Sequence, residues 1–469
     1  MAELTEQVFR ESGDDRPRPK LVDSVPASDG EPQRSMGLSI RDGFSYSLMV
    51  GFGENYFAAF AVFLGANNFQ LGVLTSLPPL VAGLTQFFSL QVLEKFKSRK
   101  KMVCAFAFLQ GCMLIPLFFS YKIEALRFEA YILLVILYTA AGMFIGPIWN
   151  SWIGDIVPSS KRGVYFGKRN RAITIGTFLS MLVAGFILRS YKEMNLELTG
   201  FLSIFTLALL ARVWSTYFLS KKMEPSYSLV PTHFGDFLVF FKSILTRNEG
   251  RLILYMAAIN FAVYMAAAYF TPYLLRTLNF SYMTYTLIVG GIALTKFFTS
   301  SFWGEICDRM GERKVIYVTG LLVPLSTVPW AFTGSAFWLF AAQCFSGFLW
   351  AGYELATFTF LLNAVSPSER ARVVGYSSII VSAAAFLGGL VGSLIVLYGP
   401  VLLHPFALVF LVSAILRLIA MLVFVPQIKE VRTLHAVKTS EVLIQAMGFK
   451  SAVGFTRALF VDMWNKKKK

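Results

Sequence analysis

The sequence predicts an all-α integral membrane protein with 12 transmembrane helices in two pseudo-symmetric six-helix bundles. Of its 469 residues, 56% are hydrophobic and only 15% are charged, and 46 are Phe. A soluble chain usually carries roughly 25% charged residues, so most helices here must face lipid or one another. Apolar runs long enough to cross a bilayer follow one another along the chain, and similar segments recur in its two halves.

Each apolar run is about 20 residues long or longer, which is the length that a membrane-spanning helix needs. Only helices and closed barrels satisfy every backbone polar group in lipid, and runs of this length are predicted to be helices. The predicted helices cover residues 44–64, 71–96, 102–120, 131–156, 173–190, 201–220, 252–275, 285–303, 315–333, 336–364, 374–397 and 401–425.

Polar stretches flank and divide these helices into five predicted regions. They are a disordered cytosolic leader (1–36), a six-helix bundle (37–220), a cytosolic linker with a short surface helix (221–250), a second six-helix bundle (251–426) and a cytosolic tail (427–469). The leader lacks the apolar core of a cleavable signal peptide. The tail ends in four lysines, so it either rests on anionic lipid or is solvated.

The net charge of +16 comes from basic residues in short loops rather than from a nucleic-acid-binding face. Loops after even-numbered helices hold 20 Lys and Arg residues, whereas loops after odd-numbered helices hold 5. Basic loops stay on the cytosolic side, so both termini are predicted to be cytosolic in a plasma or inner membrane. Nucleic acid is not a predicted partner.

Neither a metal nor a cofactor is predicted. The four cysteines lie in or beside apolar segments without metal-ligand spacing, and we interpret them as buried thiols. No nucleotide-phosphate loop is present, which disfavours transport driven by ATP. The three histidines do not cluster with Asp or Ser, so a membrane-embedded enzyme, although an alternative, lacks a recognisable catalytic arrangement.

Similar segments recur in the same order in the two halves. Residues 98–103 align with residues 311–316, and residues 158–167 with residues 367–375. Arg212, late in the sixth helix, aligns with Arg417, late in the twelfth, and we expect both to be structural. The order indicates an internal duplication, which is common in transporters whose substrate site lies between the repeats.

The loop after the eighth helix resembles the signature loop of the major facilitator superfamily. It reads Gly304-Glu-Ile-Cys-Asp308-Arg309-Met-Gly311-Glu-Arg313-Lys314. The loop after the fourth helix resembles that superfamily's motif at the same place, with Pro158, Arg162, Gly163 and Gly167. With the helix count, the resemblance covers residues 41–425 and implies a transporter that rocks two bundles about a central site.

Two features depart from the family pattern. In the first half, the signature's Gly and Asp positions hold Gln91 and Lys95, so an acid-dependent gate there is degraded. The fifth predicted helix, residues 173–190, contains no proline. It therefore lacks the Gly-Pro pattern of drug–proton antiporters in this superfamily, which disfavours drug efflux.

The resemblance also implies gating contacts at the cytosolic side. In the family, an acid such as Asp308 engages the opposite half and helps to hold that side shut, and Arg169 or Arg171 are the partners expected from the repeat symmetry. The alternative is that these loops are topology signals with solvated charges. The predicted gating residues are Gly304, Asp308, Arg309, Gly311, Arg313, Lys314, Arg162, Gly163 and Arg370.

Ionisable side chains inside the membrane are costly and mark functional sites by default. Glu54 lies in the first predicted helix, Lys296 in the eighth and Glu354 in the tenth, which in this superfamily surround or adjoin the central cavity. We expect Lys296 to contact an anion and Glu54 or Glu354 to carry a proton, because desolvation lets a carboxyl group load and release one. The alternative is a structural Glu–Lys pair.

Four further polar residues on cavity-side helices are candidate hydrogen-bonding partners of a substrate, although such residues often serve packing instead. They are Asn55, Asn150, Asn260 and Tyr264.

The predicted function is secondary active transport of a small solute or amphipathic molecule by alternating access, coupled to protons, with the protein working as a monomer. One alternative is a lipid flippase of the same fold. Another is a non-transporting membrane sensor or partner subunit, in which the tail would be the active surface.

Overall fold

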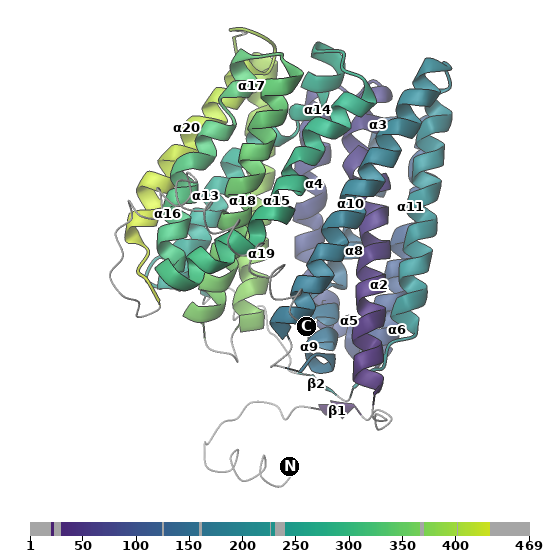
Figure 1. The fold of residues 1–469 in the computed structure, drawn as a ribbon, viewed down its shortest axis with the longest axis vertical. Coiled ribbons are helices and arrows are strands. Elements are labelled where there is room, and N and C mark those ends of the chain that lie inside the picture. The colour runs from purple at the N-terminus through teal and green to yellow at the C-terminus, as the bar shows by residue number, and fades with distance from the viewer. Residues whose placement is uncertain are drawn as a thin grey trace, which may run out of the picture.

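The computed structural model is a bundle of long helices, with β1 and the start of α2 at one end (Figure 1). It describes residues 20–22, 30–123, 126–158, 162–225, 227–229, 240–365, 370–400 and 402–431. The tail from residue 432 onward and most of the predicted surface helix, residues 234–241, lie outside these ranges. The strands β1 (Lys20–Val22) and β2 (Tyr227–Leu229) pair antiparallel.

The first half is helical between short loops. Its first helix begins at Glu31, inside the stretch predicted as leader, with a proline at the favoured helix start. The elements are α2 (Glu31–Phe52), η1 (Glu54–Tyr56), α3 (Phe57–Phe63), α4 (Asn68–Thr85), η2 (Gln86–Phe88), α5 (Ser89–Phe96), α6 (Arg99–Cys112), α7 (Leu114–Phe119), η3 (Ser120–Lys122), α8 (Arg127–Phe144), α9 (Gly146–Ile156), α10 (Arg162–Glu193) and α11 (Glu197–Ser220).

The second half repeats this plan. Its elements are α13 (Asn248–Ala267), α14 (Phe270–Pro272), the π-helix η5 (Tyr273–Thr277), α15 (Tyr282–Met310), α16 (Glu312–Leu322), η6 (Val323–Ser326), α17 (Pro329–Phe332), α18 (Ala336–Ala364), α19 (Arg370–Tyr398), α20 (Ala407–Phe424) and η7 (Val425–Gln427).

Within the described part of the chain, nine helices are long and apolar enough to cross a membrane. The predicted first, second and tenth spans are also helical, as α2 to α3, α4 to α5, and α18. They are less apolar because they carry polar residues along their length. All 12 predicted spans are therefore helices, as expected.

The two halves meet along two pairs of helices, α4 with α19 and α10 with α15. Small residues allow close approach. A Cβ added to Gly72 would lie 1.9 Å from Ser393 Oγ, and one added to Gly185 would lie 2.4 Å from Thr286 Oγ1. Such small-residue contacts are a common way for membrane helices to associate.

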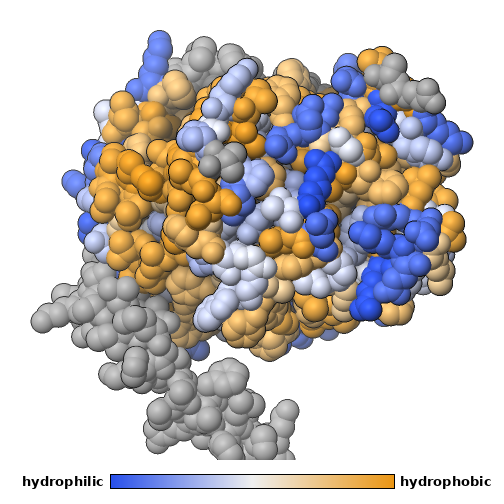
Figure 2. Space-filling model, turned by 90° about the horizontal axis from the view of Figure 1, so that it is seen from above, coloured by the Kyte–Doolittle hydropathy of each residue, from blue (hydrophilic) through white to orange (hydrophobic). Residues whose placement is uncertain are grey.

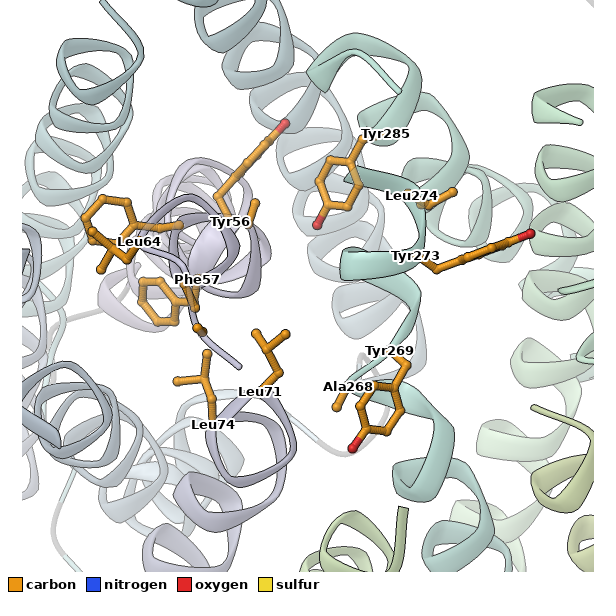
Figure 3. Packing of buried hydrophobic residues seen from close by; sticks show 14 of the residues in the cluster. Tyr56, Phe57, Leu64, Leu71, Leu74, Ala268, Tyr269, Tyr273, Leu274 and Tyr285 are labelled. Atoms are coloured by element: carbon orange, nitrogen blue, oxygen red, sulfur yellow. The ribbon is translucent and has the colours of Figure 1, made fainter. Parts of the chain in front are cut away.

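The buried core is shared at one end of the molecule and divided at the other. One cluster joins both halves, and Figure 3 shows Tyr56 and Leu71 of the first half close to Tyr285 and Tyr269 of the second. The other two clusters each lie within one half, at the end that carries the Lys- and Arg-rich loops, here called the basic end. The halves are thus packed together at the opposite end, called the outer end, and separate at the basic end.

Hydrophilic side chains are interspersed with hydrophobic ones on the face seen from above in Figure 2. This mixture is the pattern expected of an end face that meets water, whereas large exposed apolar side chains such as Phe186, Leu210 and Phe298 occur along the helices and suit contact with lipid.

The predicted duplication extends to individual contacts at the basic end. Arg99, at the start of α6, donates from Nη1 to Asp155 Oδ2 at 2.6 Å. At the aligned positions of the second half, Asn363 Nδ2 donates to Glu312 Oε1 at 2.8 Å. The contact survives in both halves, but its charges differ.

The segments that follow the last helix of each half also make matching contacts. The backbone N–H of Lys100 donates to Glu224 Oε1 at 3.2 Å, and that of Arg313 donates to Glu430 Oε2 at 3.1 Å. In each half, a carboxylate after the sixth helix therefore caps the start of the third helix, where a negative charge is favourable.

Candidate functional site

Glu54 is placed by a break in the first transmembrane helix. The helix α2 ends at Phe52, Gly53 adopts φ −107° and ψ −78°, and Glu54 begins the short η1 segment before α3 resumes. Gly53 has little room for a side chain, because an added Cβ would lie 3.0 Å from the Met49 carbonyl oxygen and 3.3 Å from Ala208 Cβ. The break turns the Glu54 carboxylate into a cavity.

That cavity, here called the Glu54 cavity, has a volume of about 410 Å³ and lies within the first half. Its lining is mostly apolar, with a few polar groups, as in most small-molecule sites. It is formed by Tyr46, Glu54, Phe57, Ala58, Leu74, Thr75, Pro78, Pro79, Gln110, Val135, Thr139, Gly142 and Met143.

The Glu54 carboxylate accepts a hydrogen bond from the Tyr138 hydroxyl, with 2.9 Å between Oε1 and the phenolic oxygen. No Lys or Arg lies within ion-pair distance of it among the residues that the structure describes. A membrane carboxylate without a cation partner is the arrangement expected of a group that exchanges a proton rather than one locked in a salt bridge.

Two consecutive prolines in α4 add polar backbone groups to the same cavity. Pro78 and Pro79 lack the N–H groups that would bond to the carbonyls of Leu74 and Thr75, and all four residues line the cavity. Proline in transmembrane helices is tolerated where such carbonyls find other partners. The wall therefore offers hydrogen-bond acceptors to a bound solute.

A second cavity of about 210 Å³ adjoins the first toward the basic end, and the two share Tyr46 and Gly142. We call it the Arg169 cavity. It is lined by Asp42, Tyr46, Val103, Gly142, Ile145, Gly146, Trp149, Asn150, Arg169, Arg212 and Leu219. Of the predicted cavity residues it contains Asn150, and it also contains Arg169, which the sequence suggested as a gating partner, and Arg212, which it suggested as structural.

Lys296 and Glu354 form an ion pair in the second half, with Nζ and Oε1 2.7 Å apart. Their side chains are 30% and 56% exposed, so both reach a wet space or the surface. This contact matches the alternative stated from the sequence, in which a Glu and a Lys inside the membrane form a structural pair. It lies apart from the Glu54 cavity, whose lining comes entirely from the first half.

The remaining predicted cavity residues have local roles. Asn55 Nδ2 donates to the Val50 carbonyl at 3.2 Å, and its own carbonyl accepts from the Tyr285 hydroxyl at 3.2 Å. Asn260 Nδ2 donates to the Met256 carbonyl within α13 at 2.8 Å. Tyr264 is half-buried on the same helix and lines neither cavity.

The predicted gating residues are only partly described. Arg309 lies at 4.0 Å from Glu305 in an exposed i,i+4 pair, and Gly311 has a positive φ of 92° at the turn into α16. Arg313 contributes its backbone N–H to Glu430. Gly304 and Lys314 are half-buried, at the end of α15 and the start of α16. The side chains of Asp308, Arg162 and Arg370 and the surroundings of Gly163 lie outside the described part.

Sequence reasoning missed a contact that joins the halves at the outer end. Arg276, on the π-helix, donates from Nη1 to the Ala66 carbonyl at 2.6 Å and from Nη2 to the Val62 carbonyl at 2.9 Å. The Val62 carbonyl lies in the last turn of α3 and the Ala66 carbonyl lies just beyond it, where a cation is favourable. The only signal in the sequence was an isolated arginine in a loop that otherwise lacks basic residues.

Tyrosines reinforce the same junction. The Tyr56 hydroxyl lies 2.5 Å from Thr286 Oγ1 and donates to the Met181 carbonyl at 2.8 Å. The Tyr282 hydroxyl donates to the Glu197 carboxylate. Tyr56 and Glu197 belong to the first half, whereas Thr286 and Tyr282 belong to the second. These two contacts therefore join the halves at the outer end and hold it closed.

Arg212 and Arg417 are both 3% exposed, so they lie inside their bundles rather than reaching toward water. Arg212 donates to the Ala107 carbonyl and to Ser215 Oγ, each at 3.2 Å. Arg417 donates to Thr327 Oγ1 at 2.6 Å. Each ties a sixth helix to a third helix or its own turn, which agrees with the predicted structural role.

Comparison with known proteins identifies the family. The family model of the Major Facilitator Superfamily matches residues 43–292 and again residues 252–463. The chain is 24% identical over 368 residues to the multi-drug resistance efflux pump PmrA homolog of Lactococcus lactis. This alignment covers 76% of the present chain and 85% of the Lactococcus protein.

Two solved structures share the fold. A variant of the nucleoside transporter NupG superposes with a TM-score of 0.67 at 15% identity, over 84% of this chain and 100% of that one. The xylose transporter XylE from E. coli, in a partially occluded inward-open conformation, gives a TM-score of 0.65 at 12% identity, over 87% and 100%. Since the family model matches both halves, the chain belongs to the Major Facilitator Superfamily and is an integral membrane transporter.

Proposed function

We propose that this chain is a proton-coupled secondary transporter of a small amphipathic solute, with Glu54 as the proton carrier and the Glu54 cavity as the substrate site. The basic end faces the cytosol of a plasma or inner membrane, so the conformation is inward-facing. The protein works as a monomer by rocking of the two halves.

The observation that carries the proposal is the unpaired Glu54 carboxylate at the wall of a cavity of about 410 Å³. By contrast, Glu354 is neutralised by Lys296 at 2.7 Å, so it is poorly suited to cycle between charged and neutral forms. Tyr138 can donate to the ionised carboxylate and accept from the protonated one, since a phenol hydroxyl does both.

The division of the core supports alternating access. The outer end is held by apolar packing and by the Arg276 bonds to Ala66 and Val62, whereas the basic end has a separate core in each half. A solute bound to the first half can therefore be exposed on the other side if the outer contacts open and the basic end closes. Charge at Glu54 would bias that equilibrium.

The test is solute-induced proton flux. The full-length protein is reconstituted into liposomes that contain a pH-sensitive dye, and a panel of amphipathic solutes is added under an imposed solute gradient. We expect the pH inside the liposomes to change when the transported solute is added, and the sign of the change shows whether protons move with the solute or against it. Glu54→Gln, which keeps the size and removes titration, should abolish the coupled proton flux and uphill accumulation while leaving solute exchange intact.

The matched control is Glu129→Gln, the same change at an exposed residue at the start of α8, which should behave like the parent protein. Uphill accumulation at the parental level by Glu54→Gln would refute the proton role. Retention of exchange by that variant shows that it is folded and able to rock.

A second, more specific candidate function is proton-coupled export of the solute. It is favoured by the similarity to a multi-drug resistance efflux pump homolog and by the apolar lining of the Glu54 cavity, although α10 contains no proline. Vesicles of opposite sidedness separate the two directions, because an exporter accumulates solute only in inside-out vesicles under a proton gradient.

A further inference from the structure

The Arg169 cavity has an excess of positive charge. Arg169 and Arg212 line it, Lys222 lies beside it, and among the described residues Asp42 is the one carboxylate in its wall. A cavity of about 210 Å³ is large enough for a carboxylate or phosphate group with a few water molecules. A cation in this cavity can bind a ligand only if its N–H groups are not already bonded to protein groups.

Asp42 is committed to neighbours on the last helix of the first half. Its Oδ2 lies 3.0 Å from Lys222 Nζ, and its Oδ1 accepts from Ser215 Oγ at 2.7 Å. Burial lowers the pKa of Lys222, whereas the contact with Asp42 opposes that shift. Since both residues are buried, Asp42 and Lys222 form a closed pair that leaves the two arginines uncompensated.

Arg212 is also held by the fold, through the Ala107 carbonyl and Ser215. Arg169 is different. Its guanidinium lies 4.2 Å from the centre of the Trp149 ring, and its buried Nε has no hydrogen-bond partner among the described residues. A guanidinium has five N–H donors, so Arg169 is the cation of this cavity that is available to a ligand.

The internal repeat distinguishes Arg169 from residues that serve only the shared fold of the two halves. The Arg212 position is occupied by Arg417 in the second half, as expected of a scaffold residue. At the place of Arg169, the aligned loop puts Ser377 or Ser378, whose hydroxyls donate to the Val374 carbonyl of their own helix. The arginine is thus a property of the first half alone, where the Glu54 cavity also lies.

We propose that Arg169 binds a carboxylate or phosphate group of the transported molecule, whose less polar part occupies the adjoining Glu54 cavity. The inference rests on the proposed function and narrows its substrate to an amphipathic organic anion. The Trp149 ring keeps the guanidinium in place by a cation–π contact, so the site is formed before the ligand arrives. Asn150, which is exposed in the same wall, supplies a further donor.

The test measures binding directly, without transport. The full-length protein in phosphatidylcholine nanodiscs is titrated with phenylacetate and phenyl phosphate, and with the neutral phenylacetamide, by calorimetry and thermal shift. We expect the two anions to bind and to raise the melting temperature, and the amide to do neither. Arg169→Gln should weaken anion binding at least about tenfold, the usual effect of losing a charge-assisted hydrogen bond.

Arg171→Gln is the matched control, because Arg171 lies two residues further on α10 and is exposed. It should bind like the parent. Arg169→Lys keeps the charge and should retain part of the affinity, which guards against misfolding of the glutamine variant. A second arm replaces phosphatidylcholine by phosphatidylglycerol without any added solute.

Stabilisation that depends on Arg169 supports the site in either arm, and the arm that responds shows whether the anion belongs to a soluble molecule or a lipid headgroup. Equal binding of anion and amide, or unchanged binding by Arg169→Gln, would overturn the site. Absence of anion binding by the parent protein, together with intact Glu54-dependent proton flux, would refute this inference alone. Intact anion binding without such flux would refute the proposed function alone.

Discussion

The outer contact made by Arg276 can be tested by removing its donors. Arg276→Met keeps most of the aliphatic stem and eliminates both hydrogen bonds to the carbonyls of Ala66 and Val62, at 2.6 and 2.9 Å. These bonds join the two halves, so they exist only while the outer end is closed. Their loss should destabilise that conformation relative to one with an open outer end.

The size of the effect follows from the geometry. A hydrogen bond to a charged group contributes about 1.5–3 kcal/mol, but Arg276 is only partly buried and water can replace it at the freed carbonyls. We therefore expect a total of about 2 kcal/mol for the pair. This shifts the ratio of closed to open outer ends by about 30-fold, which would turn a rare open state into one that spectroscopy detects.

The assay is a distance distribution between spin labels at exposed positions of the two halves, Met194 and Tyr398, in a background without native cysteines. Arg276→Met should add a population with a longer distance between the labels. Arg127→Met, the same change at an exposed residue at the start of α8, is the matched control. An unchanged distribution in Arg276→Met would show that apolar packing alone closes the outer end.

Two further predictions concern packing and pH. Gly51→Ala should lower the free energy of unfolding by about 1–3 kcal/mol, because its Cβ would lie 1.8 Å from Ser180 Oγ; Gly37→Ala, with no atom within 4 Å, is the control for a thermal denaturation series. Burial lowers the pKa of His404, and this ring donates through Nε2 to the Trp330 carbonyl and accepts at Nδ1. The unfolded state therefore binds protons more readily, so stability should be lost as the pH falls through about 6.5. The melting-temperature difference between the parent and His404→Gln should shrink from pH 7.5 to 5.5, and a constant difference would contradict the role of this ring.

Much of the fold could be predicted because hydropathy in lipid is a strong constraint. The 12 spans, the two-bundle layout and the family are confirmed by the helices and by the family match. The boundaries moved where polar residues continue a helix beyond the apolar core, as at Glu31 and Arg162. Hydropathy cannot locate such ends, because they lie in water or in the interface.

The candidate site could be predicted only in part. Intramembrane charge singled out Glu54, which does line a cavity, but periodicity could not show that Lys296 and Glu354 pair with each other elsewhere. Arg169 was noticed only as a gating partner, because nothing in a basic loop distinguishes an arginine that turns inward over Trp149 from one that faces water. The assignments of these residues remain predictions.

The internal duplication allows the candidate functional residues to be ranked by comparing the two halves of this one sequence. Contacts that occur in both halves, such as Arg99 with Asp155 and Glu312 with Asn363, serve the shared scaffold at the basic end. A feature found in one half alone has no such structural reason to exist.

Glu54 meets that criterion. With the offset that aligns Tyr46 with Tyr255, the counterpart of Glu54 is Val263, an apolar residue on α13. Both described cavities discussed above also lie in the first half, whereas the intact signature loop lies in the second. Under the proposed function the two halves of the duplication differ in task, so variants that impair binding should cluster in the first half while variants that impair gating cluster in the second.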